Sequence, residues 1–304
     1  MSSPEQVAWV FNLDAEDELA RSGAHTPTDL MTARIERLLP LLRGLIGPGD
    51  GIFWPGNEQV QPGLWGRAWC PTRWARTQLA HAGLRVPRAP TVEVLRRVNH
   101  RHFAHELGQA LPSAGWAASR EQLTSLLAAT DELNQVSVEG CWLLKRPLSY
   151  AGRGRRKLRP GALTEADQSW LDASLRDGDG LQVEPLVARE LDCALHGWLA
   201  EDGQCTFGRV TLQHLDATGA WQATELAAPG TFTEVELGAL TQAARQTAGA
   251  LHAEGYFGPF GLDAFRWRAP DGKRSFQPRS EVNARYSMGW ATGMGDFRPP
   301  PGVN

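Results

Sequence analysis

Apolar residues in the first 90 positions alternate between short strand-like runs and longer stretches with helical spacing. Val7 to Phe11 is an unbroken apolar run, which predicts a buried strand. Residues 32–45 carry apolar side chains at helical intervals that Pro40 interrupts, and a second helix is expected from Pro71 to His81. This alternation predicts a small α/β layer over residues 1–90.

The next part of the chain, residues 91–187, is predicted to form a central subdomain of helices and buried strands. The expected elements are helices over residues 91–107, 121–134 and 164–175, a strand over residues 141–147, and a strand over residues 181–187. The last of these strands cannot continue regularly past Pro185, because proline donates no hydrogen bond to a neighbouring strand.

Residues 188–304 are predicted to form a third unit that is rich in hairpins. Residues 191–201 and 205–215 flank Asp202-Gly203, which is a typical hairpin turn. Residues 234–253 have the apolar spacing of a long amphipathic helix, and the proline-rich end, residues 297–304, is expected to be a loose tail.

Composition narrows the possible partners and the compartment. The 304 residues carry a formal net charge of −3, so the chain has no overall basic surface for nucleic acid. No apolar run is long enough to cross a bilayer, and the first residues do not resemble a secretion signal, so no membrane partner is expected. The four cysteines are scattered, and we expect reduced thiols in a cytoplasmic protein. The pattern gives no oligomeric state.

A pair of strand-like segments near the end of the chain carries the clearest chemistry. Residues 261–265 and 280–289 flank Asp271-Gly272, a strong hairpin signal. Side chains two positions apart on a strand share a face, so Glu281 and Asn283 point the same way, followed by Arg285. Carboxylate and amide oxygens suit Mg²⁺, and a guanidinium suits phosphate.

The register of this hairpin decides whether Asp263 can join the two other oxygen ligands. A two-residue Asp271-Gly272 turn would place Glu281 opposite Leu262, and Asp263 would then face away. A three-residue loop or a bulge brings Asp263 to the same face, and Pro278 is a natural place for a bulge. The alternative is a polar hairpin whose charges lie in water.

A second chemical signal lies at the end of the strand that is predicted over residues 141–147. Lys145 on this strand precedes a basic loop in which Gly152, Arg153, Gly154 and Arg155 follow one another. Such a loop can close over a polyphosphate through its backbone N–H groups and its cationic side chains. Its spacing is not that of a Walker A motif, and a solvated basic loop or a nucleic-acid contact is an equal alternative.

The order of these motifs resembles the ATP-grasp superfamily over roughly residues 86–295. The motifs that carry the resemblance are Asn99-His100-Arg101, Lys145 with its glycine loop, residues 183–187 with Glu190, Gly261-Leu262-Asp263, and Glu281-Val282-Asn283-Ala284-Arg285. The resemblance implies an α/β fold of the α+β grasp type. In it the N-terminal layer, residues 1–90, precedes two α+β subdomains, residues 91–187 and 188–304, that clasp ATP between them.

The resemblance also implies residue roles. Lys145 and Arg101 would bind the ATP phosphates, and Gly152, Arg153, Gly154 and Arg155 would form the flap over them. Glu184 and Leu186 would present backbone atoms to adenine, and Glu190 would lie near the ribose or the lysine. Asp263, Glu281 and Asn283 would hold Mg²⁺ or Mn²⁺, with Arg285 beside the γ-phosphate. Many members carry an acidic residue and a lysine where this chain has His100 and Arg101.

The implied activity is ATP-dependent ligation, in which a carboxylate is activated as an acyl phosphate and joined to an amine or similar nucleophile. Both substrates would be small molecules lying between the N-terminal layer and the hairpin, with Ser287 among the possible contacts. A phosphotransferase or carboxylase on the same scaffold, and a nucleotide-binding protein without catalysis, are the alternatives. Trp65 and Trp69 are expected in the core, with a ligand site as the alternative.

Overall fold

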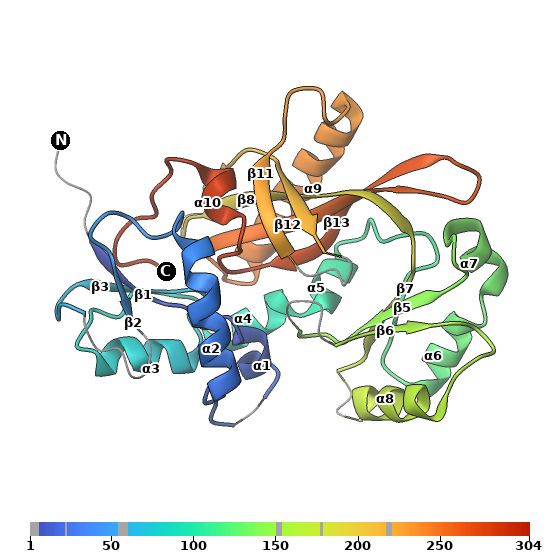
Figure 1. Ribbon diagram of the computed structural model, residues 1–304, viewed down its shortest axis with the longest axis horizontal. Coiled ribbons are helices and arrows are strands. Elements are labelled where there is room, and N and C mark those ends of the chain that lie inside the picture. The colour runs from blue at the N-terminus through green and yellow to red at the C-terminus, as the bar shows by residue number, and fades with distance from the viewer. Residues whose placement is uncertain (1–5, 22, 54–59, 150–153, 177–178, 217–220) are drawn as a thin grey trace.

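The computed structural model describes residues 6–304, except for residues 22, 54–59, 150–153, 177–178 and 217–220. Three sheets divide the described chain, and they follow one another in sequence (Figure 1). None of the described helices is both long and apolar enough to cross a membrane.

The first sheet is parallel, with strand order β2-β1-β3. Its strands are β1 (Val7–Val10), β2 (Gly51–Phe53) and β3 (Trp65–Ala68). The helices beside it are α1 (Ala15–Leu19), α2 (Asp29–Leu38), the 3₁₀ helix η1 (Leu39–Leu42) and α3 (Arg73–His81). Strand β1 is buried along its whole length, as its apolar run predicts. The helix predicted over residues 32–45 instead starts at Asp29 and changes to η1 at Pro40, which lacks the N–H that an α-helix needs.

The second sheet is antiparallel, with strand order β4-β7-β5-β6. Its strands are β4 (Gly115–Ala117), β5 (Trp142–Lys145), β6 (Arg155–Leu158) and β7 (Leu181–Pro185). It is packed with α6 (Arg120–Leu127), α7 (Thr130–Val136) and α8 (Glu165–Leu175), which lie on the right in Figure 1. Thr164 and Asp167 form a capping box at the start of α8, and β7 ends at Pro185 as expected.

The third sheet is antiparallel, and its strand order β11-β10-β8-β12-β13 places β8 and β12 in the middle. Its strands are β8 (Ala188–Leu199), β9 (Cys205–Phe207), β10 (Thr211–Leu215), β11 (Trp221–Leu226), β12 (Gly258–Arg268) and β13 (Arg274–Asn283). Helix α9 (Glu234–Ala253) contacts β13 and β8, and α10 (Trp290–Met294) contacts β8 and β11. The hairpin β12–β13 extends toward the second sheet in Figure 1.

Three predictions about secondary structure are wrong. The helix expected over residues 91–107 is two helices, α4 (Val92–Asn99) and α5 (Arg101–Glu106), because His100 has extended backbone dihedrals and caps α5 with its ring. Residues 121–134 likewise divide between α6 and α7. The end of the chain is packed: Arg67 donates hydrogen bonds to the carbonyls of Pro299 and Pro300, and the buried Asn304 side chain pairs with the backbone of Ala68.

The largest hydrophobic core joins the first and third sheets, since it includes Trp9 of β1, Leu199 of β8 and Leu262 of β12. The second sheet has a separate core around Trp142 and Leu171. The first and third units are therefore packed as one body, although about 100 residues of the central unit separate them in sequence.

The end of α4 is fastened to the chain just after β13 by one side chain. The Nδ2 atom of the buried Asn99 donates to the carbonyls of Leu95 and Ala284 at 2.9 and 3.3 Å, and its Oδ1 accepts from the amide of Ala284 at 2.9 Å. Ala284 lies between Asn283 and Arg285, so this contact fixes the backbone of both predicted site residues.

Replacing Asn99 by alanine should lower the free energy of unfolding by about 1–3 kcal/mol, because the buried amide of Ala284 loses its partner. Urea denaturation measures the change. Asn134→Ala on the exposed face of α7 is the matched control and should stay within about 0.5 kcal/mol of the wild type. Equal effects of the two substitutions would contradict the structural role of Asn99.

Candidate functional site

The hairpin β12–β13 has the register that brings Asp263 and Glu281 together. The amide of Ala269 donates to the carbonyl of Lys273, which leaves a three-residue loop containing Asp271. Phe265 is paired with Gln277, whereas the next matched pair is Asp263 with Glu281. Between these pairs β12 advances by two residues and β13 by four, so the bulge contains Pro278. The hairpin therefore contains both the three-residue loop and the bulge at Pro278, the two features that could bring Asp263 to the same face as Glu281.

Asp263 lies at the centre of a polar cluster. Its Oδ1 accepts a hydrogen bond from Gln213 Nε2 at 2.9 Å, and its Oδ2 accepts one from Asn283 Nδ2 at 3.1 Å. Burial, and next the negative charge of Glu281, raise the pKa of Asp263 to about 6, although the two hydrogen bonds act in the opposite direction. Gln213 comes from β10, and no motif in the sequence indicates its role.

Glu281 is surrounded by cations. Its Oε1 lies 2.7 Å from a guanidinium nitrogen of Arg101, which is itself buried. Burial alone would raise the pKa of Glu281, but Arg101, followed by three other cations, outweighs burial and lowers it. Arg101 also donates to Ser149 Oγ at 2.7 Å and to the Arg146 carbonyl at 2.6 Å. It therefore joins the end of β5 to the hairpin.

Lys145 is almost completely buried and its ammonium lies 2.5 Å from Glu184 Oε1. Burial lowers the pKa of Lys145 to about 8, although the charge of Glu184 acts in the opposite direction. Glu184 lies on β7 beside β5, and its side chain holds the lysine, a contact that the sequence interpretation missed. The sequence interpretation instead predicts that the backbone of Glu184 contacts adenine.

The loop predicted to be a flap is described only in part, since Gly152 and Arg153 lie outside the described residues. Gly154 has φ of +65°, and a Cβ atom there would lie 2.9 Å from the Cβ of Ser149, so a glycine is needed. Arg155 begins β6, and it is paired directly with Lys145 of β5.

Two expected adenine or ribose contacts are placed differently. The amide of Leu186 donates to the Cys141 carbonyl at 2.8 Å, and its carbonyl accepts from Ser137 Oγ at 2.6 Å, so the backbone of Leu186 is already paired. Glu190 is skipped in the pairing of β8 with β12, and its carboxylate lies 2.5 and 2.9 Å from nitrogens of Arg268 and Arg274. Glu190 is therefore turned away from the lysine.

The remaining predicted residues meet around one cavity of about 160 Å³ between the second sheet and the hairpin. Lys145 and Arg155 line it from the second sheet, and Asp263, Glu281 and Asn283 line it from the hairpin. Its predicted members are Arg101, Lys145, Arg155, Asp263, Glu281, Asn283 and Arg285. Others that line it were not predicted, among them Ser149, Arg189, Asp192, Gln213 and Trp221. Asp192 lies two residues after Glu190 on β8. It lines the cavity together with Lys145, whereas the sequence interpretation predicts Glu190 near this lysine.

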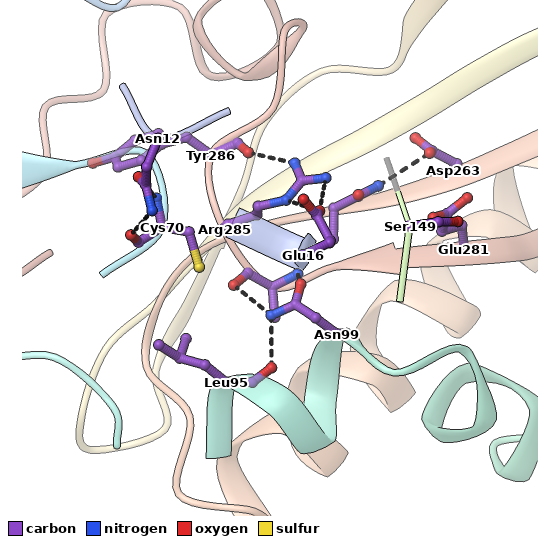
Figure 2. A network of polar contacts seen from close by, with 12 residues as sticks. Asn12, Glu16, Cys70, Leu95, Asn99, Ser149, Asp263, Glu281, Arg285 and Tyr286 are labelled. Atoms are coloured by element: carbon purple, nitrogen blue, oxygen red, sulfur yellow. Dashed lines mark hydrogen bonds and ion pairs between the residues drawn. The ribbon is translucent and has the colours of Figure 1, made fainter. Parts of the chain in front are cut away.

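Arg285 is held by the N-terminal unit. Its Nε lies 2.5 Å from Glu16 Oε1, and its other nitrogen atoms contact the same oxygen and the Tyr286 carbonyl. Figure 2 shows the guanidinium between Glu16 and Tyr286, on the side of the network away from Glu281. The guanidinium also lies over the ring of Trp69. Helix α1 thus positions the cation that follows β13.

The side chains of Asp263, Glu281 and Asn283 carry the kind of oxygen atoms that a hard divalent cation prefers. Two carboxylates are cross-strand partners and an amide lies beside them. Burial, and next the charge of Glu281, raise the pKa of Asp263, and a cation between the two carboxylates would oppose both effects. Among the described residues no group of three or more acidic, histidine or cysteine side chains is placed to hold a metal ion.

The charge of Asp263 should make the ligand-free protein less stable at neutral pH. Its pKa is raised from 3.8 to about 6, so the folded state binds more protons between these values, and stability falls as pH rises through this window. Asp263→Asn should remove this loss and raise the free energy of unfolding at pH 7.5 by about 1–3 kcal/mol.

Urea denaturation at pH 4.5 and 7.5 in a metal chelator measures this effect. Asp271→Asn in the exposed turn is the matched control and should follow the wild type at both pH values. A wild type and an Asp263→Asn variant with the same change in stability between these pH values would contradict the raised pKa.

No protein-family model matches the sequence, and no curated protein is significantly similar to it. Solved structures do share its fold. D-cycloserine synthetase superposes with a TM-score of 0.55 at 12% identity, and the alignment covers 95% of each chain. Carboxyaminoimidazole ribonucleotide synthase from Aspergillus clavatus, complexed with ATP, has a TM-score of 0.51 at 12% identity, covering 98% of this chain and 78% of that one.

A third similar structure is the ATP complex of biotin carboxylase from Campylobacter jejuni. Its TM-score is 0.53 at 14% identity, and the alignment covers 97% of this chain and 66% of that one. These neighbours are all members of the ATP-grasp superfamily. The mixed α/β architecture expected from the order of motifs is confirmed. The protein therefore has the ATP-grasp fold.

Proposed function

We propose that the protein is an ATP-dependent ligase, which activates a carboxylate as an acyl phosphate and transfers the acyl group to an amine or similar nucleophile. The observation that carries this proposal is the single cavity that joins Lys145, Arg101 and Arg155 to Asp263, Glu281 and Asn283. Phosphate-binding cations and oxygen ligands for a divalent cation are the two requirements for binding the ATP phosphates.

Within this cavity each side has a distinct role. Lys145 binds the phosphates as a point charge, and Glu184 keeps the lysine in place and charged despite its burial. Arg101 and Arg155 neutralise further phosphate charge. Gly152, Arg153 and Gly154, which directly precede Arg155 in the sequence, are proposed to cover the phosphates.

Asp263, Glu281 and Asn283 would hold Mg²⁺ or Mn²⁺, which neutralises phosphate charge and orients the phosphoryl group when it is bound. Arg285 is proposed to bind the γ-phosphate and the acyl phosphate made from it. The Arg285 guanidinium is positioned for this role by Glu16 rather than by a residue of its own hairpin.

The proposed reaction has two steps. A carboxylate oxygen of the acid attacks the γ-phosphorus, the bond to the β-phosphate bridging oxygen breaks, and ADP leaves with the electron pair. The amine nitrogen then attacks the acyl carbon, the acyl carbon–oxygen bond breaks, and phosphate leaves as the nitrogen loses a proton. Catalysis comes from positioning and charge stabilisation, because the protein supplies no covalent intermediate.

The structural neighbours support the general activity by their names, which are a synthetase, a synthase and a carboxylase, one of them solved with ATP and one with β-γ-ATP. Four free thiols fit the reducing cytoplasm, which we propose as the location. Small-molecule acids and amines are the proposed partners.

Hydroxylamine tests the first step without knowledge of the natural amine. It converts an acyl phosphate into a hydroxamate and phosphate, so MgATP, hydroxylamine and a broad panel of carboxylic acids should give equal amounts of ADP and hydroxamate with at least one acid. Calorimetric binding of MgATP with no ADP and no hydroxamate from any acid would instead identify a nucleotide-binding protein without catalysis.

Glu281→Gln should lower the rate of ADP release by about 10²–10³-fold, because it removes a charge from the proposed metal site. Lys145→Met should have a similar effect, but alone it leaves Glu184 buried without a partner, which costs about 3–5 kcal/mol. The double variant Lys145→Met/Glu184→Gln removes both charges and keeps the fold, and circular dichroism checks this. Lys273→Met in the exposed turn is the control with an unchanged rate.

A further inference from the structure

A second cavity, of about 210 Å³, opens beside the first one. The two cavities share Gln213, Trp221, Asp263, Asn283 and Arg285, so a molecule in the second cavity lies against the same polar wall that faces the proposed phosphate site. The rest of the second cavity is formed by the N-terminal unit and by the chain after β13: Leu13, Arg34, Leu38, Trp69, Ser287, Met288 and Gly289.

The far side of this second cavity is mostly apolar, although Arg34 of α2 also lines it. Leu13 precedes α1, Leu38 ends α2, Trp69 follows β3, and Met288 precedes α10. Trp69 is held in place by Phe11, whose ring centroid lies 6.4 Å away, and by the guanidinium of Arg285 over its ring. The indole is therefore a fixed part of the wall and not a side chain that can turn away.

Most polar groups in the lining are already paired within the protein. Gln213 and Asn283 both donate to Asp263, and Trp221 Nε1 donates to Thr224 Oγ1 at 2.8 Å. Arg285 is paired with Glu16, and Arg34 also has a partner. The exception is Ser287, whose Oγ is buried and has no hydrogen-bond partner among the described residues.

This arrangement restricts what can be bound. A charged side chain of the ligand would lose its water against Leu13, Leu38, Trp69 and Met288, at a cost of several kcal/mol. An apolar body would instead gain from contact with the indole and the aliphatic side chains. A cavity of about 150 Å³ admits benzene, so this one has room for a ring of that size and a short chain that reaches Arg285.

We propose that the second cavity binds the acid that is activated, and that this acid has an uncharged aromatic or branched aliphatic body of about the size of a benzene ring. This inference rests on the proposed ligase function. The carboxylate lies at the shared wall beside Arg285, the body lies against Trp69 and Leu38, and the hydroxyl of Ser287 binds one polar group of the acid.

The hydroxylamine assay with acids of matched size tests the inference. One set contains 3-phenylpropionate, L-phenylalanine, 4-methylpentanoate and L-leucine, and the other contains glutarate, L-glutamate, 6-aminohexanoate and L-lysine. The value of kcat/KM should be at least about tenfold higher for the best acid of the first set than for any acid of the second.

A highest kcat/KM for an acidic or basic member would overturn the inference and leave the ligase function standing. No hydroxamate and no ADP from any acid, with MgATP still bound, would overturn the proposed function and the inference with it. The two failures are therefore distinguishable.

Substitutions at Leu38 test whether this cavity is the acid site. Leu38→Trp should fill the cavity and raise KM for the preferred acid at least about tenfold, with the Kd of MgATP unchanged. Leu38→Ala should enlarge the cavity and shift the preference toward larger acids such as 2-naphthylacetate. Leu41→Trp, on the exposed face of η1, is the matched control, since Leu41 is 52% exposed and does not line the cavity. Unchanged KM values in both Leu38 variants would overturn the assignment of the cavity.

Discussion

Two carboxylates of this protein, those of Asp263 and Glu281, are cross-strand neighbours because β13 contains a bulge that β12 lacks. Burial disfavours the charged form of Asp263, and the like charge of Glu281 adds to the cost, so the pKa of Asp263 is raised. Two buried carboxylates so close together are stable only where neighbouring groups offset their negative charge. Here Arg101 contacts Glu281, and Gln213 and Asn283 donate to Asp263. The whole candidate site is organised around that compensation.

The compensating cations come from different parts of the chain, and most of them have an acidic partner of their own. Lys145 is paired with Glu184 in the central unit, and Arg285 is paired with Glu16 in the N-terminal unit. Charges in the site are therefore balanced before any ligand arrives. In the proposed function a divalent cation that enters with the ATP phosphates would cancel part of their charge, so that the pair would disturb this balance less than the phosphates alone.

Much of the fold and part of the site follow from local signals in the sequence. The buried strand β1, the capping box of α8, the end of β7 at Pro185 and the bulge at Pro278 each depend on neighbouring residues and could be predicted. The motif order gave the fold. Lys145, Asp263, Glu281 and Asn283 line one cavity, and the resemblance of the motif order implied that they would lie close together.

What the sequence could not give depends on contacts between distant residues or on a single backbone torsion. Glu16 and Arg285 are 269 positions apart, and nothing near either residue identifies its partner. The break at His100 needs one residue to leave the helical region within a continuous helical pattern. Glu190 was assigned by its position after β7, but the irregular pairing of β8 turns it away and leaves Asp192 at the cavity.

The shared core of the first and third sheets has a mechanical consequence. These two units hold Glu16, Asp263, Glu281 and Arg285 around one shared core, whereas the second sheet, with its separate core, carries Lys145 and Arg155. In the proposed function ATP would lie between these two bodies, so a change in their relative orientation would alter its contacts. The proposed acid site is lined by described residues of the first and third units alone, so its geometry would survive such a change.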